Sequence, residues 1–266
     1  PKQPAAESRI RQIHVLTVNT ALVGLCLVYG VYLFSQLAYF VGGLAGVLPE
    51  GFTMAEYARR GFFEMAALCA INLALIALAV GLVEKGEKPP LSTRLLCLFI
   101  GIVTVFFVIT ASAKMGMYIG SYGLTRLRVL TEVIMVFLGL ATAVVCAWLF
   151  VPKMPYMKVI VIIALVMGAA VLWADVDTVV AAYNVSAYQA GMLKSVDVAY
   201  LTTLSSGAVP YIAELAEMGN SEAAAWLAET GSAYYWSSMF DDLRSWNIGD
   251  WLAGQLIDNW NYSSVK

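Results

Sequence analysis

The sequence predicts an all-α polytopic integral membrane protein, in which five transmembrane helices precede a small helical extracytoplasmic domain. Apolar residues make up 61% of the 266 residues and charged residues only 13%, whereas a water-soluble domain carries roughly a quarter charged residues. Long uncharged stretches recur along the chain, and a helix needs about 20 such residues to cross a hydrocarbon core of roughly 30 Å. The strict alternation of a membrane β-barrel is missing from the sequence.

Five stretches have the length and composition of a membrane span, and they cover residues 15–41, 62–83, 95–113, 129–151 and 156–174. The last is the shortest, but its segment VIVIIALVMGAAVLW contains no charged residue. We therefore divide the chain into a five-span domain, residues 1–175, and an acidic, aromatic-rich C-terminal domain, residues 176–266.

The second span is expected to begin in the loop before it, because the segment TMAEYARRGFFE contains a capping box. Thr53 and Glu56 have the spacing at which both side chains accept hydrogen bonds from the free backbone amides of a first helical turn. No stop signal separates Arg60 from Phe62. One helix should therefore start at Thr53 and continue into the span.

Basic residues in the short connections predict the topology, because Lys and Arg are retained on the cytoplasmic side. Eight precede span one or join spans two to three and four to five, namely Lys2, Arg9, Arg11, Lys85, Lys88, Arg94, Lys153 and Lys158. Five lie on the opposite side, namely Arg59, Arg60, Lys114, Arg126 and Arg128. This bias predicts a cytoplasmic N-terminus and an extracytoplasmic C-terminal domain, whose ten acidic and three basic groups give it a net charge of −7.

The C-terminal domain is expected to form short helices. The first should end near Gly191, and the next three should be separated by Gly207, Gly219 and Gly231. Its expected core consists of Leu201, Leu204, Ile212, Leu215, Trp226 and Leu227. Eight large rings then follow within 29 residues. They form either a small core or a contact surface for a partner protein or the membrane, with Trp236, Trp246, Trp251 and Trp260 as candidate contacts.

A charged cluster is expected at the outer ends of spans two, three and four. Charges at membrane depth cost about 2.5 to 3.5 kcal/mol each unless paired or hydrated, so we expect Arg60, Arg126 or Arg128 to pair with Glu64 and Glu132. The candidate cluster is Tyr57, Arg60, Glu64, Lys114, Tyr118, Tyr122, Arg126, Arg128 and Glu132. It is interpreted either as a set of interfacial anchors or as a pocket for an anionic ligand such as a lipid phosphate or a carboxylate.

Enzymatic sites are not indicated by the sequence. It contains no HExxH, no GxxxxGK, and no serine with a serviceable histidine. Asp175 and Asp177 could bind a divalent cation only with further oxygen ligands. The four cysteines, Cys26, Cys69, Cys97 and Cys146, fall in four different spans without a CxxC. We expect no metal and no cofactor, and the isoelectric point near 5.5 argues against nucleic acid as a partner.

Five stretches of the chain resemble, in content and order, a family of bacterial multi-span membrane proteins known as domain of unknown function 4173. They are LAYFVGG at 37–43, EYARRGFFE at 56–64, YGLTRLRVLT at 122–131, AAYN at 181–184 and DVAYLTTLSSGAVPYI at 197–212. The resemblance implies a bacterial inner-membrane location and further spans before Pro1. The family has no established activity. Where its members often have an Asn-Pro-Asp-like turn, this chain has WADVD at 173–177.

These observations favour a non-enzymatic accessory or scaffold subunit embedded in the membrane. It would dock a protein partner, or a second copy of itself, through the C-terminal domain, and its other partners would be membrane lipids. The alternative is a permease or channel component, or a sensor of an anionic lipid or ligand, that uses the charged cluster. The spans contain no acid or base at mid-depth, which a proton-coupled pump would need.

Overall fold

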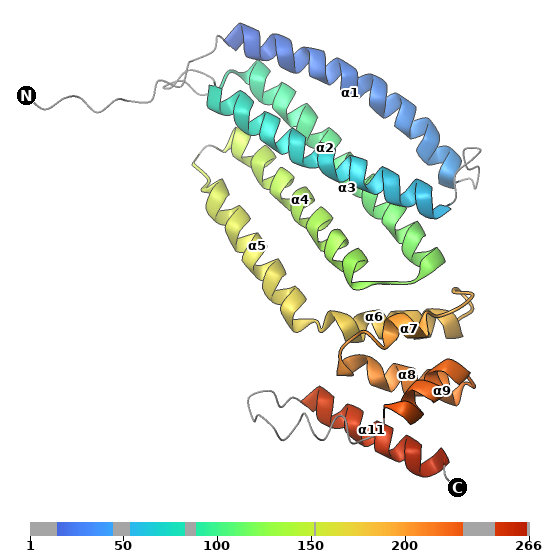
Figure 1. The fold of residues 1–266 in the computed structure, drawn as a ribbon. Coiled ribbons are helices and arrows are strands. Elements are labelled where there is room, and N and C mark those ends of the chain that lie inside the picture. Colours follow the sequence, from blue (N-terminus) through green and yellow to red (C-terminus); the bar gives the residue numbers. More distant parts are fainter. Residues whose placement is uncertain (1–14, 45–53, 83–88, 152, 231–247, 265–266) are drawn as a thin grey trace, which may run out of the picture. The chain divides into compact units, whose positions relative to one another are not determined.

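The computed structural model describes residues 15–44, 54–82, 89–151, 153–230 and 248–264, and all regular structure among them is helical (Figure 1). The chain divides into two compact units. Unit 1 contains Pro1–Gly116 and Glu132–Met167, and unit 2 contains Met117–Thr131 and Gly168–Lys266. The connection between the third and fourth long helices therefore groups with the C-terminal helices, although the sequence division at residue 175 assigned it to the five-span domain.

Five long helices begin the fold, each with a stretch long and apolar enough to cross a membrane. They are α1 (Val15–Leu44), α2 (Met54–Leu82), α3 (Leu91–Tyr122), α4 (Arg126–Phe150) and α5 (Tyr156–Trp173). The predicted all-α polytopic membrane fold is confirmed, and so is one unbroken helix through Phe62 into the second span. Thr53, the expected cap of that helix, lies outside the described residues.

Helix α3 is longer than expected. Its 32 residues correspond to about 48 Å at roughly 1.5 Å per residue, which exceeds the thickness of a hydrocarbon core. The sequence interpretation ended this span at Ala113 because a lysine follows. In the structure Lys114 is only 5% exposed, and the helix continues past it for two more turns.

The interior of unit 1 joins α1, α2 and α3 through rings and a buried polar network. The Phe107 ring is fully buried, and the Tyr29 and Tyr32 rings meet it edge-on at 6.0 and 5.4 Å. The Tyr29 hydroxyl donates to Asn72 Oδ1, and Asn72 Nδ2 donates to Thr104 Oγ1 at 2.9 Å. Interhelical hydrogen bonds of this kind stabilise helix association in lipid, where polar groups find few other partners.

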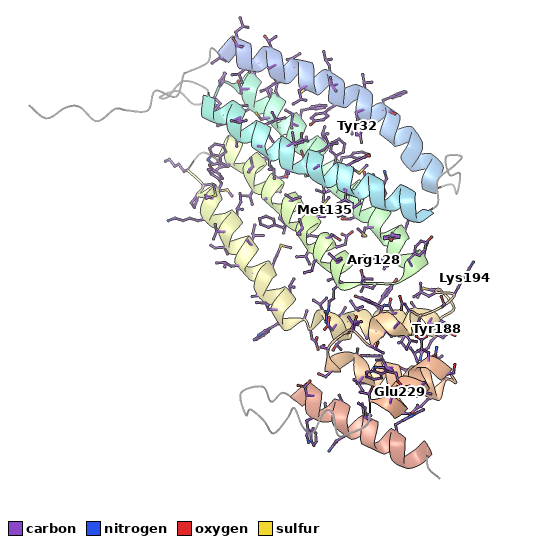
Figure 2. All side chains as sticks on the ribbon, in the orientation of Figure 1. Tyr32, Arg128, Met135, Tyr188, Lys194 and Glu229 are labelled. Carbon is purple, nitrogen blue, oxygen red and sulfur yellow. The ribbon has the colours of Figure 1, made fainter. Side chains whose placement is uncertain are left out.

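Helix α5 has the composition and exposure of a lipid-facing helix. None of its residues is buried, and large apolar side chains such as Leu165 and Leu172 are 68% and 84% exposed. Figure 2 shows side chains that project from α5 away from its neighbours. Such a surface is stable against lipid and would be unfavourable in water.

Unit 2 contains the short helices, namely α6 (Val176–Gln189), α7 (Val198–Leu201), η1 (Ser206–Ala208), α8 (Val209–Glu217), α9 (Ser221–Glu229) and α11 (Ile248–Ser264). Gly191 and Gly219 follow α6 and α8 with φ of +71° and +87°, which suits the residue just past a helix end. Gly207 was expected to end a helix, but it lies inside η1, which leads directly into α8.

The core of unit 2 contains the residues predicted from the sequence. Leu201, Ile212, Leu215 and Leu227 are buried in one cluster, and Leu204 and Trp226 pack against it. Helix α11 adds Ala253 and Ile257, which are 1% and 0% exposed. The amphipathic spacing of these short helices was therefore a reliable guide to their buried faces.

Candidate functional site

The connection between α3 and α4 is the centre of the most polar region of unit 2, and it begins at Gly123. This residue has φ +75°, and its N–H donates to the Ile119 carbonyl at 2.8 Å. A Cβ atom here would lie 2.6 Å from Asn184 Oδ1. Both the backbone conformation and the close approach of Asn184 therefore require glycine.

Asn184, on α6, holds the next residue of the connection by both backbone groups. Its Oδ1 accepts from the Leu124 N–H at 2.6 Å, and its Nδ2 donates to the Leu124 carbonyl at 2.9 Å. Asn184 is 6% exposed. Because these backbone groups lie between two helices and have no helical partner, the amide satisfies them in the way a neighbouring strand would.

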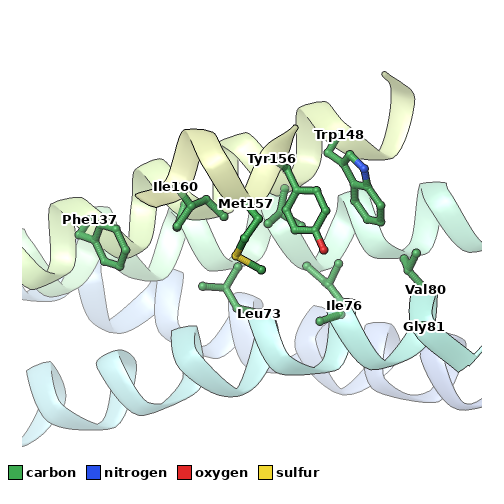
Figure 3. Close-up of a pocket in the computed structure, with 12 residues that line it drawn as sticks. Leu73, Ile76, Val80, Gly81, Phe137, Trp148, Tyr156, Met157 and Ile160 are labelled. Atoms are coloured by element: carbon green, nitrogen blue, oxygen red, sulfur yellow. The ribbon is translucent and has the colours of Figure 1, made fainter. Parts of the chain in front are cut away.

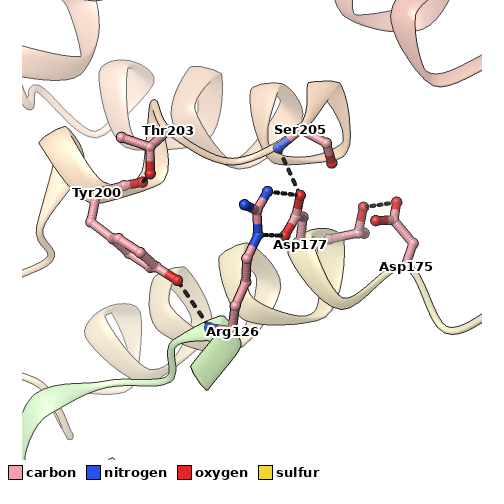
Figure 4. Close-up of polar contacts among 7 residues, drawn as sticks. Arg126, Asp175, Asp177, Tyr200, Thr203 and Ser205 are labelled. Carbon is pink, nitrogen blue, oxygen red and sulfur yellow. Dashed lines mark hydrogen bonds and ion pairs between the residues drawn. The ribbon is translucent and has the colours of Figure 1, made fainter. Parts of the chain in front are cut away.

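Arg126, the first residue of α4, forms an ion pair with Asp177 near the start of α6. The guanidinium donates through Nε and Nη2 to the two carboxylate oxygens (Figure 4). The Ser205 N–H donates to the same carboxylate at 2.9 Å. The Arg126 backbone N–H donates to the Tyr200 hydroxyl at 2.9 Å. One turn of α4 is thus attached to α6, to α7 and to the segment after α7.

The electrostatics of Asp177 follow from these contacts. The guanidinium of Arg126 lowers the pKa of the Asp177 carboxyl below its usual value, and the Ser205 N–H lowers it further. Burial acts in the opposite direction but does not prevail. Asp177 is therefore a charged partner at neutral pH, and its charge is compensated within unit 2.

A second carboxylate lies two residues earlier, at Asp175, which adopts φ +40°. Asp175 Oδ2 accepts from the Thr178 hydroxyl at 2.6 Å (Figure 4). A Cβ atom on Gly207 would collide with that hydroxyl. The two aspartates, considered from the sequence as part of a cation site, thus have separate local partners. No group of three metal-ligating side chains occurs among the residues that the structure describes.

Arg128 stabilises the end of α3. It donates to the carbonyls of Tyr122, at 3.0 Å, and Gly123, and its guanidinium carbon lies 4.1 Å from the centre of the Tyr118 ring. The Tyr118 and Tyr122 rings are 5.2 Å apart. A cation at a helix C-terminus compensates the partial negative charge of the last carbonyls, and stacking on an aromatic face suits arginine.

We name the group formed by Gly123, Leu124, Arg126, Asp177, Asn184 and Tyr200 the turn cluster. A cavity of 290 Å³ adjoins it, lined by both polar and apolar side chains that include Arg128, Asp197 and Leu193. Asp197 is already engaged as the cap of α7, where its carboxylate accepts from the Tyr200 N–H at 2.8 Å. The cavity therefore combines one cation, one anion and neutral hydrogen-bonding groups.

The nine residues of the predicted charged cluster do not all belong to this arrangement. Tyr118, Tyr122, Arg126 and Arg128 lie in unit 2, whereas Glu64, Lys114 and Glu132 belong to unit 1. Glu64 interacts electrostatically with Lys114. Glu132 Oε1 is buried, and among the described residues it has no hydrogen-bond partner. The side chains of Tyr57 and Arg60 lie outside the described residues.

The pairing expected for Arg126 was wrong, because its partner is Asp177 and not Glu64 or Glu132. Of the four candidate contact tryptophans, Trp251 is 36% exposed on α11. Trp260 packs against the core of unit 2. Trp236 and Trp246 lie outside the described residues.

A family model described as a domain of unknown function, DUF4153, matches residues 1–215. The chain belongs to the DUF4153 family. The family number expected from the sequence motifs, 4173, was wrong, whereas membership of an uncharacterised domain family is confirmed. The DUF4153 match includes all five long helices and the whole turn cluster, and it ends within α8. No curated protein and no solved structure matches the chain.

Sequence reasoning did not identify Asp177, Asn184, Tyr200 and Ser205 as the residues that hold the start of α4 and the connection before it. Three of these lie in stretches that carried the family resemblance, with Asn184 at the end of AAYN and Tyr200 and Ser205 inside DVAYLTTLSSGAVPYI. The structure brings both stretches to YGLTRLRVLT. The order of these stretches along one chain did not indicate that they meet.

Proposed function

We propose that this protein is a membrane-embedded accessory subunit that docks a partner protein through its C-terminal helical domain. The observation that carries the proposal is the exposed apolar side of α11. Trp251, Leu252 and Leu256 are 36%, 47% and 37% exposed, while Ala253 and Ile257 on the same helix are buried. Leu252 and Leu256 are i,i+4 neighbours and share one face.

An apolar helix face with a tryptophan at its edge is typical of protein interfaces. Tryptophan is enriched among the residues that dominate binding energy. The turn cluster supports a scaffold role in a different way. The described contacts of Arg126 and Asp177 satisfy other parts of unit 2, which is the pattern of a structural joint and not of a reaction centre.

Photo-crosslinking tests the docking surface. A photoreactive amino acid at position 252 or 256 should give one discrete adduct in native membranes, and Leu252→Glu with Leu256→Glu should abolish co-purification of the same partner in mild detergent. Position 225 provides the matched control, because Ala225 is exposed on α9 outside the apolar face. Equal labelling at 225 and 252, or a chain that stays monomeric and without adducts, would refute the proposal.

We further propose a bacterial inner-membrane location, with a cytoplasmic N-terminus and an extracytoplasmic C-terminal domain. Basic residues are more numerous before the first span and in the connections from span two to three and from span four to five than in the other connections, which supports this orientation. Ser221→Cys and Lys153→Cys test it, since both positions are exposed. A membrane-impermeant thiol reagent should label position 221 in intact spheroplasts and position 153 only after permeabilisation. The reverse pattern would overturn the topology.

A second candidate function is an anionic-ligand sensor, and the cavity lined by Arg128 favours it. It is less well supported, because Arg128 already donates to two carbonyls and stacks on Tyr118. If this candidate is correct, inorganic phosphate or succinate should raise the melting temperature of the native protein but not that of Arg128→Gln. An equal response of the two proteins would exclude it.

A further inference from the structure

A groove in unit 1 runs between α2, α4 and α5, among the helices that cross the membrane. Its volume is 560 Å³, within the roughly 300 to 1,000 Å³ of small-molecule sites. Figure 3 shows Met157 and Tyr156 reaching from α5 toward Leu73 and Ile76 on α2. The lining is almost entirely apolar, so its occupant must be apolar over the same length.

The groove is elongated along the helices. Its lining residues on α4 extend from Phe137 to Trp148, and these 11 helical steps correspond to about 16 Å at roughly 1.5 Å each. One leaflet of a bilayer contributes half of a hydrocarbon core of roughly 30 Å, or about 15 Å. The groove therefore has the depth of one leaflet, and its long axis has the direction of an acyl chain.

One end of the groove has the chemistry of the membrane interface. Trp148 lies near the end of α4 and Tyr156 begins α5, and their rings are 4.5 Å apart. Amphipathic rings of this type concentrate at headgroup level. Lys153 is exposed in the short connection between these two rings. Basic residues beside a groove between membrane helices attract the headgroups of anionic lipids.

Helix α5 also shows why this groove needs an occupant. No residue of α5 is buried by the protein, so packing against α2 and α4 does not fill the space between them. Water is an unfavourable occupant, because the lining offers few polar partners. Lipid is the apolar molecule present at this depth at high concentration.

We propose that this groove binds one acyl chain of an anionic phospholipid, whose headgroup faces Lys153. We name this site the lipid groove. The bound chain would complete the packing of α5 against α2 and α4. This inference is independent of the proposed docking function, which concerns α11.

Lipid retention tests the lipid groove. The full chain is reconstituted in nanodiscs of equal parts phosphatidylglycerol and phosphatidylcholine, extracted with a delipidating detergent, and assayed by native mass spectrometry. We expect about one phosphatidylglycerol to remain per chain, because a fitted groove exchanges its lipid slowly. Ala77→Phe and Gly81→Leu place side chains into the groove, and each should reduce retention by at least about fivefold.

Two comparisons keep the test specific. Ile162→Phe, at an exposed position on the face of α5 opposite to the lining residues, should retain lipid like the unmodified chain. A Cβ on Gly81 meets no atom within 4 Å, so Gly81→Leu should fold normally. Replacing Lys153 by Gln should leave one lipid bound but reduce the preference for phosphatidylglycerol by about fivefold.

Acyl-chain photolabelling gives a direct readout on the unmodified chain. Phosphatidylglycerol that carries a diazirine in its acyl chain should label peptides containing Leu73 to Gly81 or Tyr156 to Ile160 in preference to the exposed part of α1. Uniform labelling of all five long helices would overturn the proposal. Unchanged retention in both groove-filling variants would do the same. An unchanged headgroup preference in Lys153→Gln would refute the role of that lysine.

Discussion

Breaking the ion pair between Arg126 and Asp177 should destabilise unit 2. The size of this effect depends on how exposed the two side chains are to solvent. The Asp177 side chain is 11% exposed, but that of Arg126 is 48% exposed, so solvent screens the pair in part. Exposed ion pairs contribute roughly 0 to 1 kcal/mol, and removing one partner of a fully buried pair costs about 3 to 5 kcal/mol. We therefore expect Asp177→Asn to cost about 2 kcal/mol.

A double-mutant cycle separates the pair from other effects of each substitution. Arg126→Gln should also cost about 2 kcal/mol, because it leaves the Asp177 carboxylate with the Ser205 N–H as its remaining described partner. The double variant should cost only slightly more than either single variant, which corresponds to a coupling of about 1.5 kcal/mol. Pulse proteolysis of the full chain in mild detergent measures the free energy of opening of unit 2.

The exposed hydrogen bond between Gln189 and Glu214, at 2.6 Å, provides the matched control. Glu214→Gln in the same unit should change the free energy of opening by less than about 0.5 kcal/mol. If the two single costs at Arg126 and Asp177 add to the double cost within about 0.5 kcal/mol, the pair contributes no coupling. The reasoning from partial burial would then be incorrect.

Three further predictions concern acid, the glycine of the turn and the membrane interior. Arg126 lowers the pKa of Asp177. The difference in the free energy of opening of unit 2 between the unmodified chain and Asp177→Asn should therefore be constant from pH 8 to 5 and should decrease below about pH 4. A difference that already decreases near neutral pH would contradict this. Gly123→Ala should cost about 2 to 3 kcal/mol by pulse proteolysis, whereas Gly116→Ala, with open space around its Cβ, should be neutral or stabilising. Asn72→Ala removes two buried interhelical hydrogen bonds and should lower the free energy of unfolding in detergent by about 1 kcal/mol, which should appear as a lower melting temperature. An unchanged melting temperature would show that the network contributes little.

The five long helices could be predicted from the sequence because a single local quantity, the length of an uncharged apolar stretch, decides them. Helix α5 contains no charge between Val159 and its end, and its observed bounds differ from the expected ones by one residue. The rule failed at Lys114, which was taken as a helix end. Lys114 is buried and lies near Glu64. The hydropathy of a residue depends only on its type. It does not indicate whether a charged side chain will lie near one of opposite charge in the folded protein.

The partner of Arg126 could not be predicted for a related reason. Glu132 was one of the two expected partners because both acids were placed at the same end of the spans, but six residues on one helix correspond to a rotation of about 240°, which places the side chains of Arg126 and Glu132 on different faces. Asp177 is 51 residues away. Only the way in which α6 follows α5 brings it to the start of α4. Pairings across such distances depend on tertiary packing, which a single sequence determines but does not display.

The turn cluster explains why unusual residues gather in a short connection without any need for a reaction. A tight link between two long helices leaves backbone groups and helix ends unsatisfied, and each special residue here satisfies one of them. Asn184 pairs with Leu124, Tyr200 accepts from the Arg126 backbone, and Arg128 contacts the last carbonyls of α3. Since these donors and acceptors serve the backbone, a ligand would have to compete with the fold for them. The α11 surface and the lipid groove impose no such competition, which is why we propose binding at those two places and a structural role for the turn.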